Sequence, residues 1–194
     1  SLWFLLNFSF PFVLGACATF VVRERETQAL LLQNVAGVSP LTYWVTTWGF
    51  DCLCYLLPFG ATVGLLFGFD AEAFVETEGG VRMTVILLLL LFGPAGLGFS
   101  YLITLRMRSP SSAQYLVIFL NFFVAVTGAV TVFILTLINP AKFLPIINYF
   151  IWFLRLFPSF NLAKGLLFCA NLEVLSSAAY EGRALRATSP RKGG

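Results

Sequence analysis

Four long apolar runs divide the chain, and each is long enough to cross a membrane as a helix. We expect spans at about residues 1–22, 43–69, 83–105 and 114–138. A helix needs about 20 mostly apolar residues to cross the hydrocarbon core, where backbone polar groups must bond within the segment. The pattern therefore predicts an all-α, multi-pass integral membrane protein. Pro11, Pro58 and Pro94 lie inside the runs and are expected to kink these helices.

The composition agrees with a membrane protein and excludes several kinds of site. The 194 residues are 59% hydrophobic and 11% charged, whereas soluble domains carry roughly 25% charged residues. Histidine is absent, and the four cysteines (17, 52, 54 and 169) show no CxxC spacing. No catalytic residue and no metal site is therefore predicted. The net charge of +3 is spread along the chain and gives no support for a nucleic-acid partner.

The loops between the runs predict the orientation. The loop before Arg82 is acidic, whereas the loop with Arg106 and Arg108 contains no acid. Because short basic loops mark the cytoplasmic side, we expect the Arg106 loop inside and the acidic loop outside. Counting back by one span places the segment between the first two runs on the inside as well.

This inner segment, about residues 24–39, has the pattern of an amphipathic helix of about three turns. Its apolar face contains Ala29, Leu31, Leu32, Val35, Ala36 and Val38, and Gln33, Asn34 and Gly37 lie opposite. Such a helix either lies in the membrane interface or docks on a cytosolic partner. The alternating charges Arg23, Glu24, Arg25 and Glu26 lie where this segment leaves the first span. They either pair across the bundle as a switch that breaks when the helices tilt, or remain solvated.

A few polar residues lie inside the apolar runs. Asp51 is an acid some 12 Å beyond Tyr43 at about 1.5 Å per residue, so it is expected to face the bundle or a wet cavity and to have a partner. A role in helix packing and a role in substrate contact both remain open. Asn7 and Asn121 are expected to form hydrogen bonds between helices.

The chain after residue 138 is apolar but interrupted by prolines and cations. No stretch there spans comfortably, so we expect a helical hairpin over about 143–172 that dips into the outer leaflet. A fifth span over about 143–157 is the alternative. Arg155, near Trp152, is expected to reach toward lipid headgroups. The tail, 176–194, is polar and basic and is expected to be disordered.

Two blocks of sequence carry a family resemblance. The first comprises Glu24-Arg25, Leu32-Gln33, Val35, Gly37-Val38, Pro40 and Tyr43-Trp44, and continues at Asp51, Tyr55-Leu56, Pro58, 67–70 and Ala73-Phe74. The second is "LFPSFNLAKGL" (156–166), with Pro158, Asn161 and Gly165. Together they resemble subfamily A of the ABC transporters, and in particular the membrane domain of the second half of such a transporter.

The resemblance implies a type-2 ABC exporter fold and a set of partners. Residues 1–175 would form a partial transmembrane domain, with a cytosolic coupling helix at about 24–39 and an outer-leaflet hairpin. The coupling helix would keep Gln33, Asn34 and Gly37 available to a partner. Its partners would be membrane lipids, a nucleotide-binding domain and the other transmembrane half. The chain has no GxxxxGK[ST] motif, so ATP and Mg²⁺ would belong to the nucleotide-binding domains.

The implied function is ATP-driven movement of lipids or other amphiphiles across or out of the membrane. The alternatives are an ATP-independent scramblase, channel or scaffold, and an inactive gene fragment. Because the sequence begins without Met inside an apolar run, we expect a fragment of a longer protein. The substrate, the direction of transport and the particular membrane are left open by the sequence.

Overall fold

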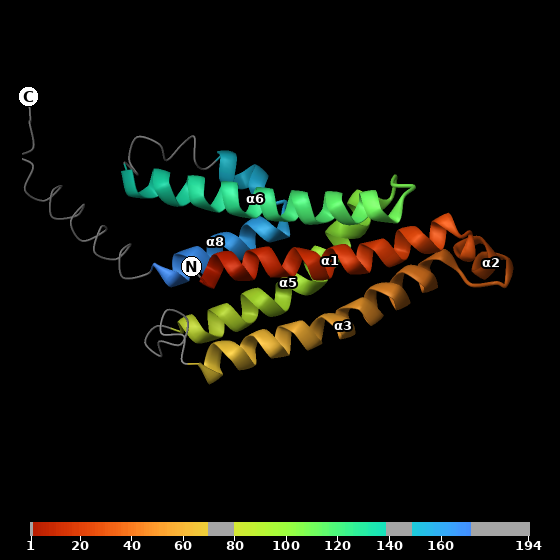
Figure 1. The fold of residues 1–194 in the computed structure, drawn as a ribbon, viewed down its shortest axis with the longest axis horizontal. Helices are drawn as coiled ribbons and strands as arrows, with labels where there is room; N and C mark the ends of the chain where they lie inside the picture. The colour runs from red at the N-terminus through yellow and green to blue at the C-terminus, as the bar shows by residue number, and fades with distance from the viewer. Residues whose placement is uncertain (1, 70–79, 139–148, 172–194) are drawn as a thin grey trace, which may run out of the picture.

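The apolar runs form long helices that pack side by side in an antiparallel bundle (Figure 1). The computed structural model describes residues 2–69, 80–138 and 149–171. Every regular element in these ranges is helical, so the predicted all-α class is confirmed. The helices are α1 (Leu2–Glu26), α2 (Ala29–Val35), α3 (Pro40–Gly68), α5 (Val81–Thr104), α6 (Pro110–Ile138) and α8 (Pro158–Ala170), with a further helical run over 149–154.

Four of these helices, α1, α3, α5 and α6, are long and apolar enough to cross a membrane. This result confirms four spans, although their ends differ from the prediction by a few residues. α3 begins at Pro40 because the Ser39 hydroxyl accepts a hydrogen bond from the backbone N–H of Thr42 (3.1 Å), and proline fits the first helical position. α1 continues through Glu26, so it includes the charged residues expected outside the span.

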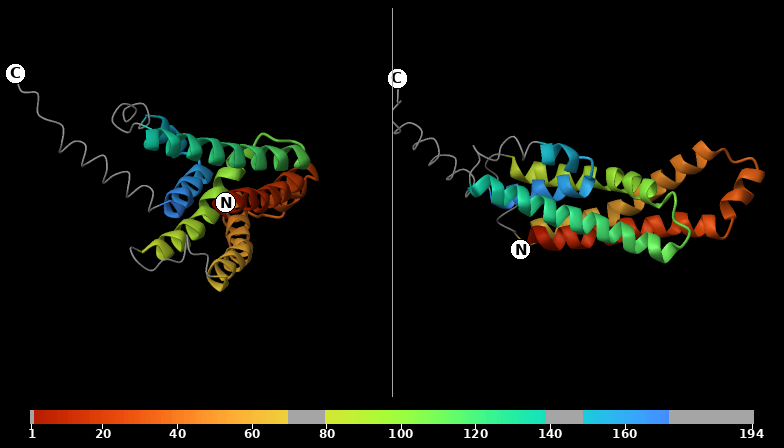
Figure 2. Two further views of the ribbon diagram at one scale, coloured as in Figure 1. Left: turned by 60° about the vertical axis from the view of Figure 1, so that its left-hand side comes forward. Right: turned by 90° about the horizontal axis from the view of Figure 1, so that it is seen from above.

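α1 and α6 pack along each other and, with α5 and α8, enclose the core. Two glycines of α5 allow close helix packing. A Cβ at Gly96 would lie 2.8 Å from Cδ1 of Leu14, and one at Gly93 would lie 2.2 Å from Cδ1 of Tyr55. Small residues at such positions let two helix backbones approach closely. α3 lies at the edge of the bundle against α5, and most of its surface is exposed (Figure 2).

α8 has 13 residues and measures about 20 Å, which is too short to cross a membrane. It lies against α5 and α6, and its first residues lie beside the middle of α6 (Figures 1 and 2). The chain turns at 155–157 between the helical run over 149–154 and α8. The acidic loop at 70–79, the first part of the expected hairpin (143–148) and the tail (176–194) lie outside the described residues.

Candidate functional site

The last turn of α1 joins, through Arg25, the end of the bundle that is predicted to face the cytoplasm, which we call the inner end. The Arg25 guanidinium donates hydrogen bonds to the backbone carbonyls of Thr104 and Leu105, at the C-terminal end of α5. The Thr104 carbonyl also accepts a hydrogen bond from the N–H of Met107 (3.0 Å) in the turn after α5, and the helix dipole places partial negative charge at this end. A cation is therefore well matched to this position. Arg25 thus connects α1 to α5.

The neighbouring residue, Glu24, connects α1 to α3. The Tyr43 hydroxyl donates a hydrogen bond of 2.5 Å to Oε2 of Glu24. Tyr43 is buried in the first turns of α3, and Glu24 is half-buried. Adjacent residues of α1 thus bind two different helices. We call Glu24, Arg25, Tyr43 and the end of α5 the inner junction.

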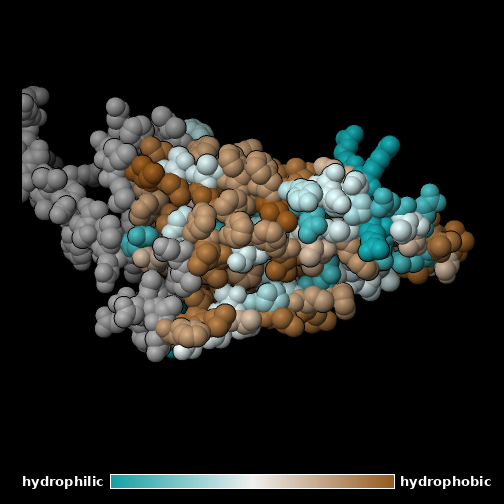
Figure 3. All heavy atoms as spheres, viewed as in Figure 1, coloured by the Kyte–Doolittle hydropathy of each residue, from teal (hydrophilic) through white to brown (hydrophobic). Residues whose placement is uncertain are grey.

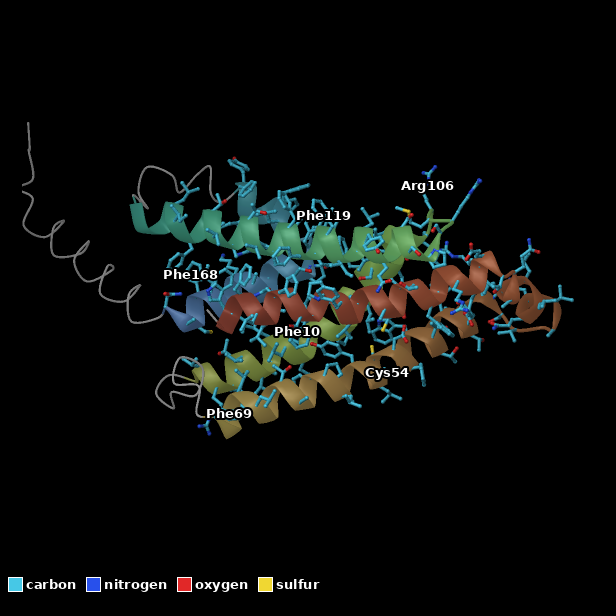
Figure 4. All side chains as sticks on the ribbon, in the orientation of Figure 1. Phe10, Cys54, Phe69, Arg106, Phe119 and Phe168 are labelled. Carbon is cyan, nitrogen blue, oxygen red and sulfur yellow. The ribbon has the colours of Figure 1, made fainter. Side chains whose placement is uncertain are left out.

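The other two predicted charges lie outside the inner junction. Arg23 and Glu26 are exposed, and their side chains have no hydrogen bond or ion pair within the described part of the chain. Arg106 and Arg108 are exposed at the same end, and Arg106 points away from the bundle (Figure 4). The structure therefore divides the four alternating charges into an inward pair and a solvated pair.

The helix expected over 24–39 is shorter than predicted. α1 takes its first residues, and Gln28 then adopts a left-handed conformation (φ 58°) that separates α1 from α2. α2 ends in two hydrogen bonds typical of a helix terminus with glycine in the left-handed region. The N–H of Val38 donates to the carbonyl of Gln33, and that of Gly37 (φ 91°) donates to Asn34. Gly37 therefore has a conformational reason for its identity.

α2 presents apolar side chains at the tip of the molecule. Leu32 is 71% exposed and Val35 is 88% exposed, whereas Gln33 is half-buried. The turn at Gln28 redirects the chain and leaves the apolar face as the larger exposed surface, and the expected role of Gln33 in contacting a partner stays a prediction. Asn34 is exposed, as expected. Figure 3 shows this hydrophobic tip beyond the hydrophilic residues that gather at the same end. We call Leu31, Leu32 and Val35 the α2 patch.

Asp51 lies inside the bundle with partners on two other helices. It is 6% exposed and accepts a hydrogen bond from the Tyr101 hydroxyl of α5. Cys17 of α1 also interacts with this carboxyl group. A buried acid is costly unless it is hydrogen-bonded, and this arrangement satisfies that requirement.

Two further hydrogen bonds connect α3 to α5. The Tyr55 hydroxyl donates to the carbonyl of Leu89 (2.6 Å), and Nε1 of Trp48 donates to the carbonyl of Pro94 (3.2 Å). With the Asp51–Tyr101 bond, they form a row along one face of α3. Sequence reasoning did not single out these donors. They could have been found in the sequence as aromatic residues that carry a hydrogen-bond donor and lie on the same helix face as Asp51.

Asn121 connects α6 to α8. The Ser159 hydroxyl of α8 donates a hydrogen bond to Oδ1 of Asn121, and both residues are buried. Asn121 therefore bonds between helices, as expected. The other residue expected to do so, Asn7, donates from Nδ2 to the carbonyl of Trp3 in its own helix (2.7 Å). Ser159 was missed because a serine between proline and phenylalanine gives no pattern of its own.

The three predicted hairpin residues have separate positions. Pro158 begins α8, and Nδ2 of Asn161 donates to the carbonyl of Arg155 (2.9 Å), which closes the preceding turn. A Cβ at Gly165 would lie 2.5 Å from Cδ1 of Leu88, so this glycine allows close contact with α5. Pro158 and Asn161 also line a groove of about 390 Å³ between α5 and α8, together with Thr84, Leu87, Leu88, Leu91, Phe92, Ala95 and Leu162.

A second groove, of about 660 Å³, lies between α1 and α6. Phe119 marks its position on α6 (Figure 4). Aromatic side chains dominate its lining, which comprises Phe8, Ser112, Tyr115, Leu116, Ile118, Phe119 and Phe122. It is a shallow surface suited to hydrocarbon.

The comparison with protein families decides the identity of this fold. The model of the ABC-2 family transporter protein matches residues 2–180, which is nearly the whole chain. The chain belongs to the ABC-2 transporter family. In this ABC-2 domain, the four spanning helices, the inner junction and the α2 patch are therefore parts of a transporter membrane domain.

Curated relatives place the domain near subfamily A. It is 34% identical over 167 residues to human ATP-binding cassette sub-family A member 2, covering 85% of this chain. It is 32% identical over 161 residues to human retinal-specific phospholipid-transporting ATPase ABCA4, covering 82%. It is 31% identical over 124 residues to human glucosylceramide transporter ABCA12, covering 64%. The ABC-2 domain spans only 7% of the length of the first two relatives and 5% of the third.

Proposed function

We propose that this chain is part of the second transmembrane half of an ATP-driven transporter that moves lipids. The observation that carries the proposal is the α2 patch, which is exposed at the end predicted to be cytoplasmic. Exposed apolar patches often mark protein interaction sites. In a domain of this family, a nucleotide-binding domain is the partner that fits it. The relatives named for phospholipid and glucosylceramide transport support a lipid as the substrate.

α2 then acts as the coupling helix, because its connections to two spans are short. Gln28 joins it to α1, and Ser39 begins the next span directly after the turn at Gly37. Because these connections are short, a displacement of α2 would move the adjoining ends of α1 and α3. The inner junction would transmit this displacement to the other helices, since Glu24 binds α3 and Arg25 binds the end of α5. ATP with Mg²⁺, bound on the nucleotide-binding domains, would supply the energy for this displacement.

The spanning helices respond by tilting, and lipid moves along their exposed apolar faces. The aromatic groove between α1 and α6 is one such face, with side chains that accommodate hydrocarbon tails. The hairpin of 149–154 and α8 lies in the outer half of the bundle, on the side expected to face outward. It is held at half depth by the Asn121–Ser159 hydrogen bond.

A reconstitution experiment tests this function. The transporter that carries this chain is placed in vesicles containing fluorescent phospholipid or glucosylceramide, and lipid movement is followed with and without ATP. We expect ATP-dependent movement for the unmodified protein. Val35→Asp places a charge in the α2 patch and should abolish that movement, whereas Arg108→Gln, which changes an exposed residue at the same end, should leave it intact.

The rival functions give different results in this assay. A scramblase or channel would move lipid or ions without ATP and would tolerate Val35→Asp. An inactive fragment would show no movement under any condition. Movement that is independent of ATP in the unmodified protein would refute the proposed function.

A further inference from the structure

Two cations lie near each other at the turn between the helical run over 149–154 and α8. Arg155 is exposed in the turn, and Lys164 is half-buried on α8, with Nζ 5.7 Å from the centroid of the Phe168 ring. Burial, followed by the positive charge of Arg155, lowers the pKa of Lys164. Arg155 lies close to α8, because its carbonyl accepts a hydrogen bond from Nδ2 of Asn161, one turn before Lys164.

The described part of the chain provides no negative charge to balance this pair. Its carboxylates are Glu24, Glu26 and Asp51, which lie at the inner end of α1 or on α3. Neither Arg155 nor Lys164 forms an ion pair with any of them. The turn lies beside the middle of the bundle, because Phe157 packs against Phe99 of α5 (ring centroids 5.2 Å apart) and Ser159 bonds Asn121. Positive charge at such a depth is costly without an anionic partner.

An apolar groove lies beside the same turn. It is the groove between α5 and α8, and it runs along the outer half of α5 from Thr84 to Ala95. Asn161 connects the groove to the cations, since it lines the groove, donates to the carbonyl of Arg155 and lies one turn before Lys164 on α8. A pair of cations next to a hydrocarbon-lined groove matches a molecule with an anionic head and an apolar tail.

We propose that Arg155 and Lys164 bind the phosphate of a membrane phospholipid whose hydrocarbon tail occupies the groove between α5 and α8. Guanidinium groups bind phosphate through paired, charge-assisted hydrogen bonds, and an ammonium adds a point charge. At half depth, this phosphate lies between the two headgroup layers, which is an intermediate position in transport. The inference rests on the proposed lipid transport and specifies the headgroup chemistry.

Photocrosslinking tests the site in the transporter that carries this chain, reconstituted in nanodiscs. The probes are a photoactivatable phosphatidylglycerol and a photoactivatable diacylglycerol, which share tails but differ in the phosphate. Labelled peptides are mapped by mass spectrometry. We expect phosphatidylglycerol to label the segment from Leu87 to Ala95 of α5, and diacylglycerol to label it weakly. The double variant Arg155→Gln/Lys164→Gln should reduce phosphatidylglycerol labelling about tenfold, because at least one charge-assisted bond is lost.

Two further variants guard against misfolding. Arg155→Lys keeps the charge and should retain most of the labelling, and Arg106→Gln, which removes a cation at the opposite end, should not change it. Equal labelling by both probes, or labelling that the double variant leaves unchanged, overturns the inference; the second result would also follow if the cations bind a carboxylate of another part of the transporter.

This outcome is distinguishable from failure of the proposed function. If ATP-driven lipid movement persists while the double variant leaves phosphatidylglycerol labelling unchanged, only the phosphate site is refuted. If phosphate-selective labelling holds while lipid movement does not require ATP, the site stands and the ATP-driven function is refuted.

Discussion

The contact between Gly93 of α5 and Tyr55 of α3 gives a sharp test of how α3 is held. The Tyr55 ring lies directly against this glycine, so a Cβ there would lie 2.2–2.7 Å from three ring atoms. The ring cannot simply move away, because Tyr55 is buried and its hydroxyl is bonded to the carbonyl of Leu89. Gly93→Ala is therefore expected to separate α3 from α5 locally.

The size of the effect follows from opposing contributions. Replacing glycine by alanine within a helix stabilises it by up to about 1 kcal/mol. Overpacking a buried contact costs about 1–3 kcal/mol, and loss of the Tyr55 hydrogen bond adds about 0.5–1.5 kcal/mol. The steric overlap and the lost hydrogen bond together outweigh the gain in helix propensity, and we expect a net loss of about 1–3 kcal/mol in the free energy of unfolding. Gly98 on the same helix has open space around its Cβ position, so Gly98→Ala should be neutral or slightly stabilising.

The assay is unfolding of the purified chain in mild detergent by titration with sodium dodecyl sulfate. Tryptophan fluorescence follows the transition. Trp48, one of the four tryptophans, contributes a signal next to the mutated glycine because it donates to the carbonyl of Pro94. The unfolding midpoint should fall for Gly93→Ala and not for Gly98→Ala. Equal midpoints for the two variants would refute packing of α3 through this contact.

Three other variants test single hydrogen bonds by the same unfolding assay, and each should lower the free energy of unfolding. Arg25→Gln should cost about 1–2 kcal/mol, since it removes the cation from the end of α5; an unchanged midpoint would contradict the inner junction. Tyr101→Phe should cost about 1–3 kcal/mol because it leaves the buried Asp51 carboxyl without this donor, and combining it with Asp51→Asn should cost less than the sum of the single losses. Ser159→Ala should cost about 0.6 kcal/mol and at most about 1.7 kcal/mol, the average and the maximum for hydrogen bonds between membrane helices. It should cost nothing further when Asn121 is already alanine.

The spanning helices were predictable because lipid leaves the backbone few choices. Any apolar run of sufficient length must form a helix there, so composition alone locates α1, α3, α5 and α6. That Asp51 has a hydrogen-bond partner inside the bundle was predictable for the same reason, since an acid within a span needs a partner. The start of α3 was predicted three residues late, at Tyr43, because apolar content was used to place it and not the cap that Ser39 forms before Pro40.

The partners of these residues were not predictable, because periodicity gives the face of a helix but not its neighbour. Tyr101 lies fifty residues from Asp51, and nothing in the local sequence pairs them. The break at Gln28 was missed for another reason. A left-handed conformation is unusual for residues other than glycine, so the charged and apolar segment reads as one helix when it is two.

Site-specific photocrosslinking at the α2 patch tests the central claim most directly. A benzoylphenylalanine residue is placed at Val35 in the transporter that carries this chain, and, as a control, at Phe69, which is 79% exposed at the opposite end of α3 (Figure 4). After irradiation, the nucleotide-binding domain should be crosslinked from Val35, with a yield that changes when ATP is added, and not from Phe69. Crosslinks from Phe69 but not Val35, or none to that domain from Val35, would contradict α2 as the coupling helix.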